Sequence, residues 1–190
     1  MRERITRKKK RSHRTFLVIC EGETERVYIE ALKHQYRLPI AIRTKVSGNA
    51  INQRLVSQYL KELGLYDKDE YRIFYVYDCD IECIVDKLNK LEGTTILTNP
   101  CIELWFLLHL KEHSRACSSE SIVKMLSAAH PSWKNYTKGK FSHEQHNQLM
   151  SNYQQAIQRA DKLEKHANPS SDMPLFIREL DNEKMTEITQ

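Results

Sequence analysis

The chain has 190 residues, enough for one globular domain with a hydrophobic core, or for such a domain with a helical appendage. Hydrophobic residues make up 40% of it and charged residues 29%, and no apolar run approaches the roughly 18 residues that span a bilayer, so we expect no membrane association. The five cysteines are scattered, and the basic N-terminus lacks the apolar stretch of a signal peptide. These features predict a cytoplasmic protein with reduced thiols.

The net charge of +5 is concentrated at the N-terminus. Residues 1–14 carry eight Lys or Arg and one Glu, which leaves 22 basic and 24 acidic residues for the rest of the chain. Such a basic arm suits the phosphate backbone of nucleic acid. A solvated tail and an arm that binds an acidic protein are the alternatives. The candidate nucleic-acid contacts in the arm are Arg7, Lys8, Lys9, Lys10 and Arg11.

Apolar patterns of strand and helix type alternate after the arm. The predicted strands are 15–20, 40–46, 71–77 and 94–98, and the predicted helices between them are 24–36, 50–63 and 84–91. A further apolar helix is predicted to begin with Asn99 as its N-cap and Pro100 at its first position. Strands separated by helices are typical of an α/β fold with a parallel sheet between layers of helices.

Strand patterns fade from about residue 119. Residues 119–129 read as a helix, residues 131–141 as irregular, and Ser142 with Gln145 as a capping box that starts a long helix to about His166. Residues 168–171 are predicted to start a last helix through about Leu180. We therefore divide the chain into a flexible arm (1–14), an α/β domain (15–118) and a helical C-terminal extension packed on it (119–190).

Acidic residues follow two of the predicted strands. The first strand leads into Glu21-Gly22-Glu23-Thr24-Glu25, and the third leads into Asp78-Cys79-Asp80. The carboxyl ends of parallel strands line one crevice, where these acids would meet, and close carboxylates repel each other unless a cation lies between them. The pattern predicts a Mg²⁺ or Mn²⁺ site that acts on phosphates. The alternative is that the glutamates only support a helix N-terminus and the aspartates only form a turn.

Three segments carry a more specific resemblance: FLVICEGETERVYIEAL (16–32), VYDCD (76–80) and NPCIELWFLLH (99–109). Together with NPSS at 168–171, they resemble the RloB/AbiLii-like family over about residues 16–180. The resemblance implies a TOPRIM fold with a helical C-terminal cap, and a metal-dependent nuclease that cleaves DNA or RNA such as tRNA. It also implies a role in prokaryotic anti-phage defence by abortive infection, often beside a separate AAA-type ATPase.

The resemblance also assigns roles to single residues. Glu21 would be a metal ligand or the general acid/base beside the scissile phosphate, and Glu25, Asp78 and Asp80 would be metal ligands. Glu103 either points into the same crevice or supports the N-terminus of its helix.

Cys79 stands where we expect an arginine from the family pattern. This difference leaves two alternative functions open. The protein could be a TOPRIM module that binds nucleotide or nucleic acid without cutting it, or an effector that is silent without its partner. The sequence is also compatible with a homo-oligomer.

Residues 133–140 interleave aromatic and basic side chains. Trp133 and Tyr136 alternate with Lys134, Lys138 and Lys140, a pattern typical of segments that bind single-stranded nucleic acid. The alternative is an ordinary exposed loop anchored by its tryptophan.

Overall fold

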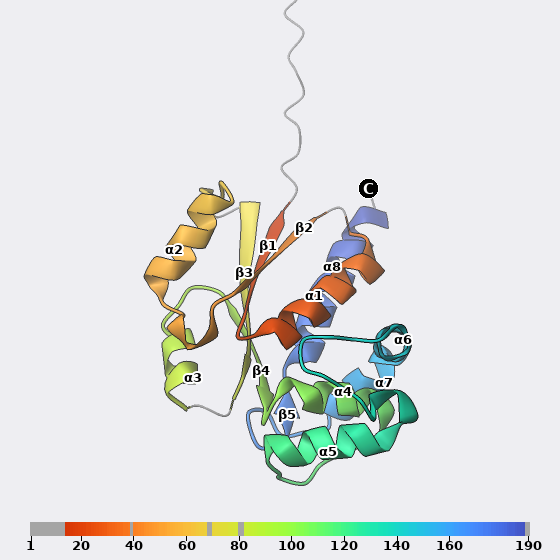
Figure 1. The fold of residues 1–190 in the computed structure, drawn as a ribbon. Helices are drawn as coiled ribbons and strands as arrows, with labels where there is room; N and C mark the ends of the chain where they lie inside the picture. Colours follow the sequence, from red (N-terminus) through yellow and green to blue (C-terminus); the bar gives the residue numbers. More distant parts are fainter. Residues whose placement is uncertain (1–13, 39, 68–69, 80–81, 189–190) are drawn as a thin grey trace, which may run out of the picture.

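The computed structural model describes residues 14–38, 40–67, 70–79 and 82–188 (Figure 1). The strands are β1 (Thr15–Cys20), β2 (Ala41–Val46), β3 (Tyr71–Asp78), β4 (Thr94–Asn99) and β5 (Ser170–Ser171). The helices are α1 (Glu23–Tyr36), α2 (Gln53–Glu62), α3 (Glu82–Leu88), α4 (Ile102–Leu110), α5 (Ser119–Ala129), α6 (His143–Ser151), α7 (Tyr153–Ala160) and α8 (Met173–Ile188). The 3₁₀ turns η1 (Gly48–Ala50) and η3 (Pro131–Trp133) follow β2 and α5.

The strands form one sheet in the order β2-β1-β3-β4-β5. The first four strands are parallel, and β5 is a short antiparallel edge strand that pairs Ser170 with Asn99 and Ser171 with Thr98. Helices cover both faces of the sheet, with α1 and α8 on one side and α2 and α3 on the other (Figure 1). This arrangement confirms the predicted α/β class, since parallel sheets are buried on both faces.

The two faces of the sheet have separate hydrophobic cores. Alternate side chains of β1 point to opposite faces, as strand geometry requires. Phe16 and Val18 pack in the larger core with residues of α1, α4, α5 and α8, whereas Leu17 and Ile19 pack in the smaller core with residues of α2 and α3. The residues of β1 from Phe16 to Cys20 have no exposed surface, so the strand that leads into the acidic segment is rigidly held.

Two predicted helix starts are wrong. Asn99 does not cap α4; it is the last residue of β4, where its pairing with Ser170 keeps the backbone extended, and the Asn99–Pro100 peptide bond is cis. The helix begins at Ile102, with Cys101 as its N-cap. Similarly, α2 begins at Gln53 and not at residue 50, because Asn52 caps it by accepting a hydrogen bond from the Leu55 N–H (3.0 Å).

The C-terminal segment also differs from the sequence prediction. The capping box of Ser142 and Gln145 is confirmed, but the helix that it starts ends at Ser151 and is followed by α7, so no single helix reaches His166. Residues 168–171 do not start a helix, because Ser170–Ser171 extends the sheet as β5. The last helix runs from Met173 to Ile188, beyond the predicted end.

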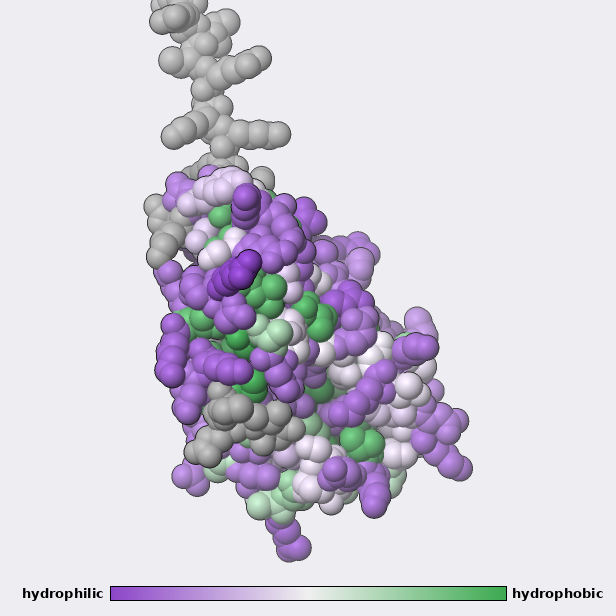
Figure 2. Space-filling model, turned by 60° about the vertical axis from the view of Figure 1, so that its left-hand side comes forward, coloured by the Kyte–Doolittle hydropathy of each residue, from purple (hydrophilic) through white to green (hydrophobic). Residues whose placement is uncertain are grey.

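The side of the molecule covered by α2 and α3 is mainly hydrophilic, with apolar surface exposed between its elements (Figure 2). A cavity of about 530 Å³ on this side is lined by Ala50, Ile51 and Leu91, with Lys87 and Lys90 beside them. None of the helices among the described residues has the length and apolar character needed to cross a membrane.

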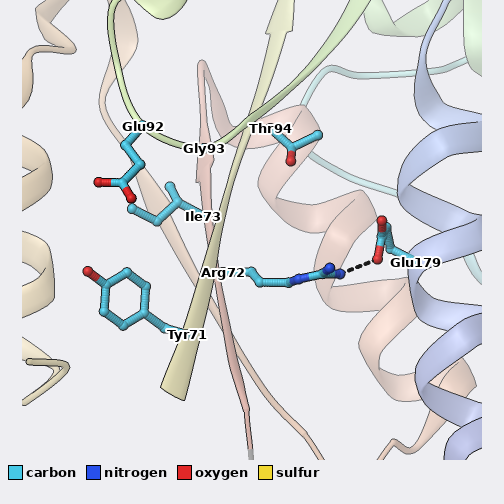
Figure 3. A pocket seen from close by; sticks show the side chains of 7 residues that line it. All are labelled: Tyr71, Arg72, Ile73, Glu92, Gly93, Thr94 and Glu179. Carbon is cyan, nitrogen blue, oxygen red and sulfur yellow. Dashed lines mark hydrogen bonds and ion pairs between the residues drawn. The ribbon is translucent and has the colours of Figure 1, made fainter. Parts of the chain in front are cut away.

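A second cavity, of about 210 Å³, lies where β3 and β4 begin (Figure 3). Its arginine, Arg72, pairs with Glu179 of α8, so the positive charge is already neutralised. Gly93 is required there, because its φ is +144° and a Cβ would lie 2.8 Å from the Tyr75 ring. This cavity is at the amino ends of the strands, away from the acidic residues that follow β1 and β3.

Candidate active site

Glu21 and Glu25 are positioned by the turn from β1 into α1. Glu21 follows the last residue of β1, and its backbone N–H donates to the Val76 carbonyl of β3 (3.0 Å). Gly22 is the N-cap of α1, and its N–H donates to Oε2 of Glu25 (2.8 Å). A Cβ at position 22 would lie 3.1 Å from that oxygen, so glycine leaves room for the Glu25 carboxylate to turn back over the start of the helix.

Asp78 links the ends of two strands to the start of α4. It is the last residue of β3, and its backbone N–H donates to Oε2 of Glu21 (3.0 Å). Its own Oδ1 accepts a hydrogen bond from the N–H of Ile102, the first residue of α4 (2.8 Å). The end of β1, the end of β3 and the N-terminus of α4 therefore meet at one point.

Glu103 lies in the first turn of α4 and has no exposed surface. Its Oε1 accepts a hydrogen bond from the Tyr136 hydroxyl (3.0 Å) and lies 3.5 Å from Nζ of Lys138. Its Oε2 is buried and has no hydrogen-bond partner among the described residues. A buried, unpaired carboxylate oxygen is costly, so its presence suggests a ligand that satisfies it.

We call Glu21, Glu25, Asp78 and Glu103 the acidic cluster, because their charges act on one another. Burial, and then the charges of Glu25, Glu21 and Glu103, raise the pKa of Asp78 to about 9. Burial also raises the pKa of Glu25, and the charges of Glu21 and Glu103 raise it further. The backbone hydrogen bonds to this carboxylate lower the pKa, but by less. Such mutual repulsion is relieved when a cation is bound between the groups.

The loop of residues 133–140 brings a cation to this cluster. Burial lowers the pKa of the Lys138 ammonium group, but the charge and hydrogen bond of Glu103, with the charges of Cys101 and Asp78, together raise it by more. The next residue, Gly139, donates its N–H to Oγ1 of Thr24 in α1 (2.9 Å). Gly139 has a φ of +74°, and a Cβ there would lie 3.0 Å from Cγ of Glu23. The loop is therefore fitted closely to the start of α1.

The structure brings together four of the five predicted catalytic residues. They come from the turn after β1, the first turn of α1, the end of β3 and the first turn of α4. Asp80 and the arm residues Arg7, Lys8, Lys9, Lys10 and Arg11 lie outside the described residues. Lys134 and Lys140 are exposed, as a phosphate contact requires, and Lys138 lies at the acidic cluster itself.

Trp133 is a buried anchor of the loop and not a surface on which a nucleobase could stack. It has no exposed surface, it donates from Nε1 to Oε1 of Gln148 (2.7 Å), and its ring stacks on Phe106 of α4. It anchors the 133–140 loop and cannot offer a face to a nucleobase. The anchoring alternative therefore describes this tryptophan, whereas the lysines around it remain exposed.

Two residues of the site are not apparent from the sequence. Tyr136 reads only as an aromatic of the loop, and Thr24 only as part of the acidic segment. Tyr136 makes a hydrogen bond to the carboxylate of Glu103, 33 positions away in the chain. Thr24 accepts one from the N–H of Gly139, 115 positions away. Contacts over such separations leave no periodic pattern that a sequence could reveal.

The donor set of the acidic cluster suits a hard divalent cation. Its oxygens are all carboxylates, which Mg²⁺ and Mn²⁺ prefer, and Oε2 of Glu103 is buried without a partner among the described residues. In the part of the chain that the structure describes, no three His, Cys, Asp or Glu side chains are already arranged around a metal position. The residues fit a metal by their chemistry and burial, and ligation would require their side chains to move from the positions that they have here.

The chain matches a known protein family over most of its length. A family model described as RloB-like protein matches residues 16–180, a range that contains the acidic cluster and the 133–140 loop. No curated protein matches the chain, and no solved structure does. Because the matched range covers most of the sequence, the chain belongs to the RloB-like protein family.

Proposed function

We propose that this protein is a divalent-metal-dependent nuclease that hydrolyses phosphodiester bonds of nucleic acid, DNA or RNA. The observation that carries the proposal is the fully buried carboxylate of Glu103, held against three further carboxylates with one oxygen unpaired among the described residues. Burying that much like charge costs free energy that hydrogen bonds alone do not offset. A bound divalent cation supplies the compensating charge.

Glu21, Glu25, Asp78 and Asp80 are the proposed ligands of Mg²⁺ or Mn²⁺, with Glu103 beside them. A bound ion of this kind polarises a phosphate and lowers the pKa of an attacking water. Glu21, Glu25 and Asp78 each accept a backbone N–H through one oxygen. Ligating carboxylates are commonly oriented by such hydrogen bonds, so these contacts would help to orient the ligands once a metal binds.

Lys138 is the proposed phosphate-positioning residue. Its ammonium group lies at the edge of the cluster, 3.5 Å from Glu103, with 64% of the side chain exposed. A substrate phosphate can therefore reach the lysine from solvent and replace part of the interaction between the lysine and Glu103. The hydrogen bonds of Tyr136 to Glu103 and of Gly139 to Thr24 hold the loop in the register that this role needs.

The family resemblance extends the proposal to biology. Abortive-infection defence against phage, alongside an AAA-type ATPase, is the role that the resemblance implies. An enzyme that destroys nucleic acid must be restrained in a healthy cell, and dependence on a partner ATPase for activity is one means of restraint. We accordingly propose that cleavage is strongest when the partner is present.

The test is cleavage by the purified protein of tRNA, single-stranded RNA, plasmid and single-stranded DNA, in Mg²⁺ and in Mn²⁺. We expect cleavage of at least one substrate class, and its loss in EDTA, in Glu21→Gln and in Asp78→Asn. The matched control is Asp86→Asn, which removes an exposed carboxylate of α3 and leaves the acidic cluster untouched. Cleavage that survives Glu21→Gln and Asp78→Asn would refute the assignment of the site.

A second candidate function is a module that binds nucleic acid or nucleotide without cutting it. It is favoured by the backbone hydrogen bonds that Glu21, Glu25 and Asp78 already make, because carboxylates can serve a fold in this way without metal. Calorimetry with Mn²⁺ separates the two functions. Metal binding without cleavage, even with the partner ATPase added, would favour the module over the nuclease.

A further inference from the structure

We propose that a groove between α5 and the 133–140 loop binds an unpaired nucleobase of a single-stranded nucleic acid, beside the acidic cluster. The inference rests on the proposed function for its biological meaning, because it names the class of nucleic acid that the site would take. Its physical basis is a separate set of residues from the acidic cluster.

The groove has a volume of about 600 Å³ and is lined from two sides. One wall is α5, with Val123, Lys124, Ser127 and Ala128, and the other is the loop, with Lys134 and Tyr136. Small-molecule sites typically measure roughly 300–1,000 Å³ and combine apolar walls with a few polar groups. The groove has this size and composition, and Lys124 and Lys134 are its charged lining residues.

The two walls are fixed relative to each other. The Ser127 hydroxyl donates to the Lys134 carbonyl (3.1 Å), which ties α5 to the loop. Behind them, Trp133 and Tyr136 belong to an aromatic group with Phe106 and Phe141, whose ring centroids are 5.2–6.4 Å apart. A preformed groove binds without the entropic cost of ordering its walls.

Tyr136 belongs to both the groove and the candidate active site. It lines the groove, and its hydroxyl donates to Oε1 of Glu103 (3.0 Å). A base seated against this side chain would therefore lie within one residue's length of the acidic cluster. The next phosphate of the same strand would then be placed at Lys138 and the cluster.

The charges beside the groove complement a sugar-phosphate backbone. Lys124 and Lys134 are both exposed, and neither is within ion-pair distance of a carboxylate in the part of the chain that the structure describes. Lys138 continues the basic side toward Glu103, while Glu120, one helical turn before Lys124, offsets part of the charge. An apolar groove beside lysines is the usual arrangement for single strands, because bases pack on apolar surface while the backbone follows the cations.

A base pair inside a duplex presents only its edges, so a groove that takes the body of a base selects unpaired nucleotides. We would measure binding by fluorescence anisotropy with the full chain in EDTA, which stops metal-dependent cleavage. The probes are a single-stranded oligodeoxynucleotide, an oligoribonucleotide of the same sequence, and a blunt DNA duplex. The two single strands distinguish DNA from RNA as the source of the base.

The decisive variant is Ala128→Leu, which fills the groove from an exposed position of α5 without adding charge or an aromatic face. We expect it to weaken single-strand binding at least about 5-fold, the low end of what a stacked base contributes, and to leave duplex binding unchanged. Ala128→Ser is the matched control and should bind like wild type. Circular dichroism confirms that each variant is folded.

The lysines are tested by salt dependence. Each phosphate contact to a single strand contributes about 0.7 to the slope of log K against log salt concentration. The double variant Lys124→Ala/Lys134→Ala should lower the slope by about 1.4, whereas Lys61→Ala, an exposed lysine of α2, should not change it. An unchanged slope in the double variant would overturn the phosphate contacts and with them the groove.

The outcomes separate this inference from the nuclease proposal. Equal single-strand affinity of Ala128→Leu and wild type, or no single-strand binding at all, would overturn the groove. A protein that cleaves nothing but loses single-strand affinity in Ala128→Leu would retain the groove and refute the nuclease alone. Cleavage that is preserved in Ala128→Leu on every single-stranded substrate would likewise count against the groove.

Discussion

Nζ of Lys138 lies 3.5 Å from Oε1 of Glu103, a carboxylate with no exposed surface. Glu103 belongs to the helix that follows the fourth strand of the sheet, whereas Lys138 comes from the loop after α5. The acidic cluster is therefore not completed by the strand ends alone. Among the described residues, the C-terminal part of the chain supplies the ammonium partner of Glu103, together with the Tyr136 hydroxyl.

Replacing Lys138 should affect activity far more than stability. Lys138→Met removes the phosphate-positioning charge, and we expect about a 10²-fold loss in kcat/KM, the size seen when one preorganised donor is removed. The lysine side chain is 64% exposed, so the ion pair should contribute less than about 1 kcal/mol to the free energy of unfolding.

The matched control is Lys140→Met, which removes the same charge from an exposed position of the same loop. It should retain activity within a few-fold, and Lys138→Arg should recover part of what Lys138→Met loses. Steady-state cleavage rates and thermal melts measure both effects. Equal losses in the Lys138→Met and Lys140→Met variants would indicate general charge and not positioning.

Gly139→Ala should displace the loop from the acidic cluster. Gly139 has a φ of +74°, and the new Cβ would lie 3.0 Å from Cγ of Glu23. We expect a loss of stability of about 1 kcal/mol from the backbone alone, with a further loss from the clash, and a clear loss of activity.

Gly64 provides the comparison, because its φ is +68° and a Cβ added there would meet no atom within 4 Å among the described residues beyond its chain neighbours. Gly64→Ala should therefore show the backbone cost without the clash and without loss of activity. Urea unfolding and cleavage assays on both variants separate the two effects. A Gly139→Ala variant as active as Gly64→Ala would show that the loop position does not matter.

Divalent metal should stabilise the wild-type protein through the acidic cluster. A ligand at 100 times its dissociation constant stabilises the folded state by about 2.7 kcal/mol, so Tm should rise on addition of Mn²⁺. Asp78→Asn should abolish this rise and should not lower Tm in EDTA, because burial and three neighbouring acids already disfavour the Asp78 charge. Asp86→Asn, on exposed surface, should respond to Mn²⁺ like wild type; an equal rise in Asp78→Asn would place the metal elsewhere.

His109 should contribute a loss of stability in mild acid, opposed by Asp78 and Glu25, whose raised pKa values favour folding as pH falls. This histidine of α4 is buried, its Nδ1–H donates to the Trp105 carbonyl (2.8 Å), and burial lowers its pKa to about 4. Between about pH 6.5 and 4 the unfolded chain binds a proton there and the folded chain does not, so the contribution of His109 to folding stability decreases as pH falls through this window. The full effect is about 3 kcal/mol at 1.36 kcal/mol per pKa unit.

Denaturant unfolding at pH 7, 6, 5 and 4 measures this dependence. His109→Leu should remove this contribution, so the stability of the variant relative to wild type should rise as pH falls over this range. His34→Gln is the control, because His34 is an exposed histidine of α1 and its loss should leave the slope as in wild type. An unchanged slope in His109→Leu would assign the acid sensitivity to other groups.

Much of the fold can be read from local patterns. Runs of apolar residues with period 2 or 3.6 predict the strands of the parallel sheet and the helices α1 and α5. They do so because an element that is buried on one or both faces needs apolar residues at regularly spaced positions. The sequence places the start of α4 two residues too early, because Asn99 has the chemistry of a cap but is held in β4 by Ser170. The β5 pairing that decides this comes from the far end of the matched region.

For the candidate site, the sequence by itself determined which acids follow which strands, and strand geometry then placed Glu21, Glu25 and Asp78 at one edge of the sheet. Tertiary structure alone decided that Glu103 is fully buried, that Tyr136 and Lys138 meet it, and that a groove adjoins them. The physical reason is the range of the interactions. Hydrophobic periodicity is a local property of the chain, whereas a contact between α4 and a loop some thirty residues later depends on how whole helices pack.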